Sequence, residues 1–511
     1  MNGAESLVHT LLANGVDTCF ANPGTSEMHF VAALDRIPGM HCVLGLFEGV
    51  VTGAADGYAR MAEKPAATLL HCGPGLANGL SNLHNARRAH SMVVNCVGDQ
   101  ATYHRPFDAP LTADTEGFAR AVSGWTRTVA RAQDVGSDAA CAVQAAFDGP
   151  GQISTLILPS DTCWEEGGVV GAALPRPKRS AAGPENIALI ARLLRRGEKV
   201  ALILGYGALR AGPLASAAAI AAATGADLWA MTSNPRIERG AGRYPINRIP
   251  YPVDQAMAAL APYQHIVLVG AQDPVGFFGY PGKPSRMSPP GSTLHVLARA
   301  EHDLPATLAA LADTLGAKAP APQARDHVEA ARGAVTSEAL AQSLTALLPE
   351  GAIVTDESVS FGRALYPNTH GAAPHDWIQL CGGAIGEGLP LALGASIACP
   401  DRRVIGLQAD GSGMYTVQAL WTMAREKCNA TIVVLSNRKY QILLGEYANV
   451  GANPGRTAMD MMDIGNPDLD WVKMANAMGV DAARVDNMAA FNDVFAQANA
   501  SAGPFVVELV I

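Results

Sequence analysis

Short apolar stretches that alternate with helix-like stretches recur along the whole chain, and this alternation limits the fold more than any other feature. Residues 66–71 (AATLLH), 200–205 (VALILG) and 403–410 (RVIGLQAD) are examples of the apolar stretches. Strand–helix alternation favours right-handed βαβ units, in which helices cover both faces of a parallel sheet. The sequence therefore predicts an α/β fold of doubly wound parallel sheets. In such sheets ligands bind beyond the carboxyl ends of the strands.

The alternation falls into three blocks. Linkers rich in Pro and in charged residues, near 175–184 and 317–326, separate residues 1–170, 185–316 and 336–511. A chain of 511 residues is long enough for several domains, and we expect one doubly wound sheet in each block. The pattern predicts helices over residues 5–14, 27–33, 48–62, 387–397 and 416–427, among others.

Composition excludes several classes of partner. The net charge is −9 and no Lys/Arg-rich run occurs, so we do not expect a nucleic acid partner. No run of about 18 apolar residues is present, and the N-terminus lacks the basic and apolar regions of a signal peptide. The nine Cys residues form no CxxC pair, which is typical of reduced thiols. We therefore expect a cytoplasmic protein without a membrane segment.

Two predicted strands of the third block end in oxygen donors. Asp410 follows the stretch VIGLQA, and Asn437 follows TIVVLS, with one helical crossover between them. Such a crossover puts consecutive strands beside each other, and a carboxylate with an amide oxygen suits Mg²⁺. Gly411 and Ser412 allow backbone N–H groups to approach an anion. A capped helix start followed by an ordinary turn Asn is the alternative interpretation.

Two residues of the first block are candidates for proton transfer. Glu48 lies among apolar residues and is either a first-turn acid favoured by the helix dipole or a buried carboxylate for proton transfer. His71 ends a predicted strand before a Gly-Pro-Gly turn, where a histidine either packs and hydrogen-bonds or acts as an acid–base group.

Five segments together carry a family resemblance. They are NPGTSE at 22–27, FEGVVTGAADGYAR at 47–60, HCGPGLAN at 71–78, GGAIGEGLP at 382–390 and ADGSGMY with LSNRKY within 409–440. In these segments the chain resembles thiamine-diphosphate enzymes of the pyruvate oxidase/decarboxylase type, above all benzoylformate decarboxylase and acetolactate synthase large subunits. The resemblance covers the whole chain. It implies that the blocks are pyrimidine-binding, central and diphosphate-binding domains.

The resemblance also implies a role for each motif residue. Asp410, Asn437 and the carbonyl of Lys439 would hold Mg²⁺. Glu48 would bond the pyrimidine ring, and Ile385 would support the bent cofactor. The remaining cofactor contacts would come from Gly383, Gly411, Ser412, Tyr440, Ser360 and Asn78.

The implied reaction is the decarboxylation of a 2-oxo acid, with carboligation to an aldehyde acceptor as a further outcome. Glu48 and His71 would carry its proton transfers. The alternatives are an acetolactate synthase-type carboligase and a lyase acting on 2-hydroxy ketones. Active sites of this family form between two subunits, so a homodimer would be the minimal unit and a homotetramer the usual assembly.

Substrate contacts follow less directly from the resemblance, because several positions depart from it. Thr25, His71, Phe278 and Glu446 are the candidates, and Glu446 stands where a hydrophobic pocket residue is expected. Glu446 would either face the pocket or face solvent. A second active-site His is missing from 271–284, and Ala409 and Ser436 replace a Gly and an Asn of the usual motifs.

Two rival classes fit the sequence less well. The stretch LGYGALRAG at 204–212 follows a strand, but its glycines do not match a dinucleotide fingerprint, which disfavours an NAD-dependent dehydrogenase and gives no indication of FAD. A binding or regulatory protein that has lost activity is disfavoured because both Glu48 and His71 are present.

Overall fold

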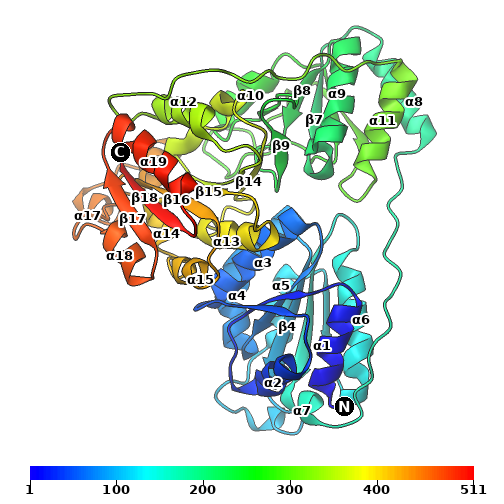
Figure 1. The fold of residues 1–511 in the computed structure, drawn as a ribbon. Helices are drawn as coiled ribbons and strands as arrows, with labels where there is room; N and C mark the ends of the chain where they lie inside the picture. The colour runs from blue at the N-terminus through cyan, green and yellow to red at the C-terminus, as the bar shows by residue number, and fades with distance from the viewer.

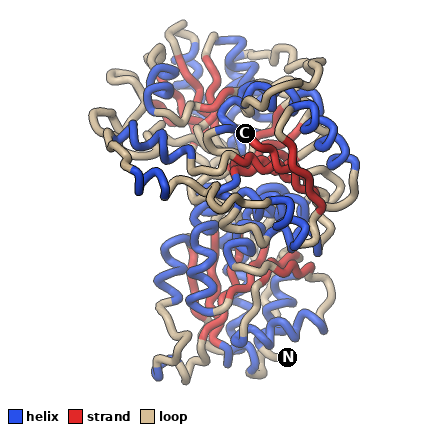
Figure 2. Tube along the Cα trace, turned by 90° about the vertical axis from the view of Figure 1, so that its left-hand side faces the viewer, coloured by secondary structure: helices blue, strands red, loops and turns tan.

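A computed structural model describes residues 1–511 and contains three sheets, each flanked by helices (Figures 1 and 2). All strand pairs are parallel except one. This arrangement confirms the predicted class of doubly wound parallel sheets.

The first sheet has six strands in the order β2-β1-β3-β4-β6-β5. They are β1 (Thr18–Ala21), β2 (His41–Leu44), β3 (Ala66–Leu70), β4 (Val93–Asp99), β5 (Trp125–Thr128) and β6 (Ile153–Pro159). Its helices are α1 (Gly3–Ala13), α2 (Met28–Arg36), α3 (Glu48–Ala62), α4 (Cys72–Ala89), α5 (Thr115–Val122), α6 (Val135–Ala146) and α7 (Ser160–Trp164). Helix α1 begins earlier than predicted because Asn2 and Glu5 form a capping box across its first turn.

The second sheet has five strands in the order β10-β8-β7-β11-β12. They are β7 (Val200–Leu204), β8 (Asp227–Ala230), β10 (Asn247–Arg248), β11 (His265–Val269) and β12 (Thr293–Ala298). The helices are α8 (Pro184–Leu194), α9 (Ala211–Thr224), α10 (Val253–Leu260) and α11 (Leu304–Leu315). An extended segment without regular structure precedes α8 and runs along the side of the molecule in Figure 1.

The third sheet has seven strands in the order β17-β18-β16-β15-β13-β14-β9. They are β13 (Ile353–Glu357), β14 (His375–Gln379), β15 (Val404–Ala409), β16 (Ala430–Ser436), β17 (Asp481–Val485), β18 (Phe505–Val510) and the antiparallel β9 (Ile237–Arg239). The helices are α12 (Ser337–Leu347), α13 (Gly388–Ala398), α14 (Asp410–Gly413), α15 (Ala419–Arg425), α16 (Gln441–Val450), α17 (Arg456–Asp460), α18 (Trp471–Ala477) and α19 (Met488–Ala500). Strand β9 lies within residues 185–316, so the predicted central block contributes one strand to this sheet.

Two local predictions differ from the structure. The helix predicted over 416–427 is shorter, because the Thr416 hydroxyl donates to the carbonyl of Gly386 (2.8 Å) in a turn that precedes α15. The Gly-Pro-Gly segment after His71 is no turn but the first turn of α4. A proline near the start of a helix loses no hydrogen bond, because the N–H groups there have no helical partner.

Helices α3 and α13 join the first unit to the third (Figure 1). They cross so closely that glycine is required at the contact: a Cβ on Gly394 would lie 1.9 Å from the carbonyl oxygen of Ala54. Next to this crossing the buried Arg60 of α3 pairs with Glu387 at 2.8 Å and donates to the carbonyl of Gln379 at 2.7 Å. The hydrophobic core that includes Val50 and Leu391 runs through this contact, so the two units share one core.

None of the helices combines the length and the apolar character that crossing a bilayer requires.

Candidate active site

The carboxyl ends of β15 and β16 form the centre of the candidate site. The two strands pair in parallel, with Ala409 opposite Leu435, which confirms that Asp410 and Asn437 follow neighbouring strands. Asp410 is buried, and its carboxylate accepts main-chain hydrogen bonds from Arg438 (2.6 Å) and Gly411 (2.8 Å). Burial raises the pKa of Asp410, while these hydrogen bonds act in the opposite direction.

The turn after β16 brings its oxygen donors towards the same edge. Arg438 adopts the left-handed region (φ 59°), and the N–H of Lys439 donates to Oδ1 of Asn437 at 3.1 Å. Tyr440 then packs on the turn of β15, since a Cβ on Gly411 would lie 2.6 Å from the Tyr440 ring. Gly411 is therefore needed for this close approach.

A buried acid that the sequence analysis missed positions the loop 383–387. Glu357, the last residue of β13, accepts hydrogen bonds from the N–H groups of Gly386 (2.6 Å) and Gly388 (2.7 Å). Gln408 links Glu357 (3.0 Å) to the hydroxyl of Ser412 (2.6 Å). Burial raises the pKa of Glu357, and these donors oppose the shift. A carboxylate at the end of a predicted strand, as at Asp410, was the signal that could have identified it.

A small cavity of about 40 Å³ lies at this edge. It is lined by Asp410, Gly411, Ser412, Asn437, Lys439, Tyr440, Ser360 and Ile385, among others. One carboxylate, one amide oxygen and main-chain carbonyls form the hard oxygen donor set that Mg²⁺ prefers when phosphate completes its coordination. Gly411 and Ser412, the two residues predicted to contact an anion, line the same cavity. The residues present thus fit a diphosphate bridged by Mg²⁺.

A larger cavity of about 840 Å³ adjoins the small one, and Ile385 and Tyr440 line both. Its wall is rich in aromatic side chains: Trp229, Tyr251, Phe277, Phe278, Tyr366 and Tyr415. Gly383 also lines it, and Phe277 packs on Gly383 so closely that a Cβ there would lie 2.3 Å from the ring. No residue of the first unit lines either cavity.

Glu446 of α16 is half-buried and lines the larger cavity. Burial and the neighbouring Glu446 raise the pKa of Tyr280, which belongs to the central block. Arg248 and Arg363 lie on the same wall. The cavity is therefore aromatic with a few charged groups at defined points.

Glu48 is the first residue of α3 and is buried. Its Oε2 accepts a hydrogen bond from Nδ2 of Asn78 at 3.0 Å, which brings together two residues predicted from separate motifs. A Cβ on Gly75 would lie 3.1 Å from Oε1 of Glu48, so a glycine leaves room for the carboxylate.

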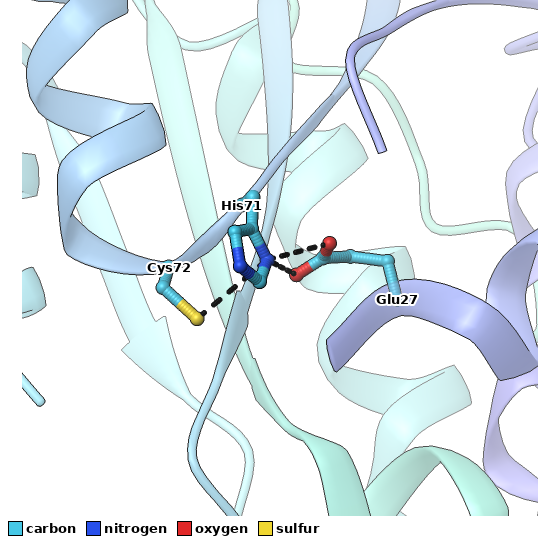
Figure 3. Close-up of side chains that lie close together, drawn as sticks. All are labelled: Glu27, His71 and Cys72. Carbon is cyan, nitrogen blue, oxygen red and sulfur yellow. Dashed lines mark hydrogen bonds and ion pairs between the residues drawn. The ribbon is translucent and has the colours of Figure 1, made fainter. Parts of the chain in front are cut away.

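His71 precedes α4 and belongs to a polar cluster (Figure 3). Its Nδ1 lies 3.0 Å from Oε2 of the buried Glu27 and 3.1 Å from the hydroxyl of Ser26. Thr25, the hydroxyl predicted to approach the substrate, is exposed, and the adjacent Ser26 makes the contact with His71 instead. Ser26, Glu27 and Cys72 were not identified from the sequence, although all three lie within the motifs at 22–27 and 71–78.

Comparison with known proteins agrees with this geometry. The family model described as "Thiamine pyrophosphate enzyme, N-terminal TPP binding domain" matches residues 1–120, and the corresponding C-terminal TPP binding domain matches residues 364–509. A Mycobacterium tuberculosis (H37Rv) protein provisionally named acetolactate synthase large subunit IlvX is 49% identical, over 100% of this chain and 99% of that protein. Benzoylformate decarboxylase of Pseudomonas aeruginosa PAO1 is 30% identical, over 98% of this chain and 97% of the enzyme.

The fold also has a solved counterpart. The thiamine diphosphate-dependent 4-hydroxybenzoylformate decarboxylase of Rhodococcus jostii RHA1 superposes with a TM-score of 0.83, at 26% identity, over 99% of this chain and 98% of that one. Its match extends across all three sheets, as do the matches of the relatives in sequence. The site geometry, the two family models and the full-length relatives lead to one conclusion: the chain belongs to the thiamine diphosphate-dependent enzymes.

Proposed function

We propose that this protein is a thiamine-diphosphate- and Mg²⁺-dependent decarboxylase of 2-oxo acids, similar to benzoylformate decarboxylase. The observation that carries the proposal is the junction of the two cavities at Ile385. The smaller cavity has the donors for a diphosphate and its metal, and the larger one has room for a substrate. A cofactor anchored in the first would therefore present its reactive end to the second.

In this proposal residues 336–511 form the diphosphate-binding domain, 1–170 the pyrimidine-binding domain and 185–316 the central domain. Asp410, Asn437 and the carbonyl of Lys439 hold Mg²⁺. Gly411, Ser412 and Ser360 contact the diphosphate, and Tyr440, Gly383 and Ile385 contact the rest of the cofactor. When bound, thiamine diphosphate supplies an electron sink that accepts the electron pair left by CO₂.

Glu48 takes the role of proton donor and acceptor at the pyrimidine ring. Its carboxylate is buried and oriented by Asn78, so it meets a ring nitrogen with a fixed geometry. Neither cavity has a lining residue from the first unit, which supports a site completed by Glu48 and His71 of a second copy. A homodimer is then the smallest active unit, and we propose a homotetramer as the assembly.

His71 handles the protons of the substrate carbonyl and of the product. Glu27 and Ser26 occupy the Nδ1 side of its ring, which leaves Nε2 to face the substrate. The carboxylate of Glu27 on one ring nitrogen fixes the orientation of the imidazole, as the carboxylate does in other acid–base pairs.

The lining of the larger cavity supports an aromatic 2-oxo acid as the substrate. Aromatic rings such as Phe278 provide flat apolar contacts, whereas Glu446 would repel a carboxylate placed beside it. The substrate carboxylate would thus lie on the cofactor side, away from Glu446. The second candidate function is an acetolactate synthase-type carboligase, which the name of the 49% identical relative favours.

The proposal is tested by measuring CO₂ release from a panel of aliphatic and aromatic 2-oxo acids, with and without aldehyde acceptors. We expect the highest kcat/KM with an aromatic acid. Glu48→Gln should abolish turnover while cofactor binding, followed by calorimetry, persists. Glu185→Gln is the matched control, because Glu185 is also a first-turn acid but lies exposed on α8.

Two results would contradict the proposal. An active Glu48→Gln protein would refute the role of Glu48. Absence of CO₂ from every 2-oxo acid, combined with product formation from hydroxy ketones, would instead favour a lyase acting on 2-hydroxy ketones.

A further inference from the structure

Three side chains of metal-binding type meet where β3 passes into α4 (Figure 3). One carboxylate oxygen of Glu27, Nδ1 of His71 and Sγ of Cys72 all lie within 4.8 Å of one another. The closest separations are 3.0 Å between His71 and Glu27 and 3.8 Å between His71 and Cys72. No other group of three such side chains occurs in the chain, and this one lies outside both cavities.

The three ligand atoms face a common point, and the hydroxyl of Ser26 marks it. This oxygen lies 3.1 Å from Nδ1 of His71 and 3.2 Å from Sγ of Cys72, and it also donates to Glu27. A polar atom already stands within reach of all three groups. An ion could replace it after a rotation of the Ser26 side chain, or could take the hydroxyl as a further ligand.

We propose that Glu27, His71 and Cys72 form a binding site for Zn²⁺ or a similar late transition-metal dication. Mixed sulfur, nitrogen and oxygen ligands are typical of Zn²⁺, whereas Mg²⁺ takes oxygen ligands only. Tetrahedral Zn²⁺ with bonds of about 2.0–2.3 Å separates its ligand atoms by roughly 3.3–3.7 Å. The separations of 3.0 Å and 3.8 Å between His71 and the other two ligands are close to this range. Three protein ligands leave a fourth position for water or for Ser26.

The ligands are largely preorganised. The carboxylate of Glu27 also accepts a hydrogen bond from the N–H of Gly24 at 2.8 Å. Its Oε1 packs against the backbone of Gly98, where an added Cβ would lie only 1.6 Å away. Cys72 is buried at the start of α4. The side chain of His71 is 21% exposed, and it provides the route by which an ion reaches the site.

Occupation of the site has a chemical consequence, and this part of the inference rests on the function proposed for His71. Binding replaces the thiol proton of Cys72 and, where Nδ1 carries one, the proton of His71, and both go to solvent. With the ion on Nδ1 the ring no longer accepts a second proton, so Nε2 retains its proton and cannot act as an acid–base group. A bound ion would therefore inhibit turnover reversibly.

The test uses the full-length protein loaded with thiamine diphosphate and Mg²⁺, titrated with Co²⁺ as a spectroscopic substitute for Zn²⁺. We expect a thiolate-to-cobalt charge-transfer band that saturates at one ion per chain and disappears when Zn²⁺ is added. Co²⁺ at the Asp410 site gives no such band, because no thiolate lies there.

Cys72→Ser should abolish the band, and Glu27→Gln should weaken Co²⁺ binding by at least about 10–100-fold, the effect of losing even an outer partner of a ligand. Cys42→Ser is the control, because Cys42 is the exposed thiol. Loss of the band in Cys42→Ser, or its persistence in Cys72→Ser, would refute the site. Zn²⁺ should lower turnover in the wild type and much less in Cys72→Ser.

The experiments distinguish failure of the metal site from failure of the role proposed for His71. A normal charge-transfer band without inhibition by Zn²⁺ would leave the metal site intact and would overturn the acid–base role of His71. Inhibition by Zn²⁺ without the band would overturn the metal site, and it would point to displacement of Mg²⁺.

Discussion

Substitution of Gly394 by Ala tests whether the crossing of α3 and α13 holds the first and third units together. The new Cβ would lie 1.9 Å from the carbonyl oxygen of Ala54, against 3.4 Å for ordinary contact, so the helices must separate by about 1.5 Å. Both atoms belong to rigid parts of the helices, so no side-chain rotation relieves the clash. Overpacking of this kind costs about 3 kcal/mol, and the better helix propensity of Ala offsets about 1 kcal/mol.

The expected net loss is about 2 kcal/mol, which corresponds to a fall in Tm of roughly 4–8 °C for units of this size. Differential scanning calorimetry measures this loss. Gly212→Ala is the control: Gly212 lies exposed in α9, and a Cβ added there would have no atom within 4 Å, so the same exchange should leave Tm unchanged or raise it. Because α3 begins at Glu48, Gly394→Ala should also lower kcat. A Gly394→Ala protein with the wild-type Tm would refute the close crossing.

Two further predictions concern buried charge. Burial, aided by Arg239, lowers the pKa of His375 from 6.5 to about 3, so the native protein keeps this ring neutral while the unfolded chain protonates it below pH 6.5. The free energy of unfolding therefore decreases as the pH falls from 6.5 towards 3, by about 2 kcal/mol at pH 5. In a plot of Tm against pH, His375→Gln should make this decrease smaller. Arg60→Met should destabilise the protein by about 3–5 kcal/mol, because it leaves the buried Asp56 and Glu387 without a positive charge beside them. Loss of the exposed Arg131 should leave Tm unchanged in the same scan.

The position of part of the candidate site could be predicted because its polar residues follow strands. A run of apolar residues in the sequence predicts a buried strand. In a parallel sheet the carboxyl ends of all such strands lie at the same edge, so the residues that follow them can be placed there. Asp410 and Asn437 were found in this way, since a single crossover separates β15 from β16. The hydrogen bond between Glu48 and Asn78 was not predicted, because no sequence pattern aligns α3 with α4.

The remainder could not be predicted because it depends on tertiary contacts and on the exact position of single residues within a turn. The close crossing of α3 and α13 depends on Gly57 and Gly394, yet a glycine within a helix pattern gives no sign of what packs on it. The cluster around His71 depends on η1 (Thr25–Glu27), where a shift of one residue decides whether Thr25 or Ser26 faces the imidazole. Glu446 faces a cavity whose other wall comes from the central block.

Asp410 and Glu357 illustrate how two acids with the same sequence signature come to have different roles. Each stands at the carboxyl end of a strand of the third sheet, and each is buried and accepts two main-chain hydrogen bonds. The donors to Asp410 come from the residues that follow β15 and β16, and its carboxylate still lines a cavity. The donors to Glu357 are Gly386 and Gly388, and Glu357 lines the larger cavity together with Gly383 and Ile385. Both acids therefore line a cavity, but the hydrogen bonds of Glu357 fix the approach to α13, whereas those of Asp410 fix the turns after β15 and β16.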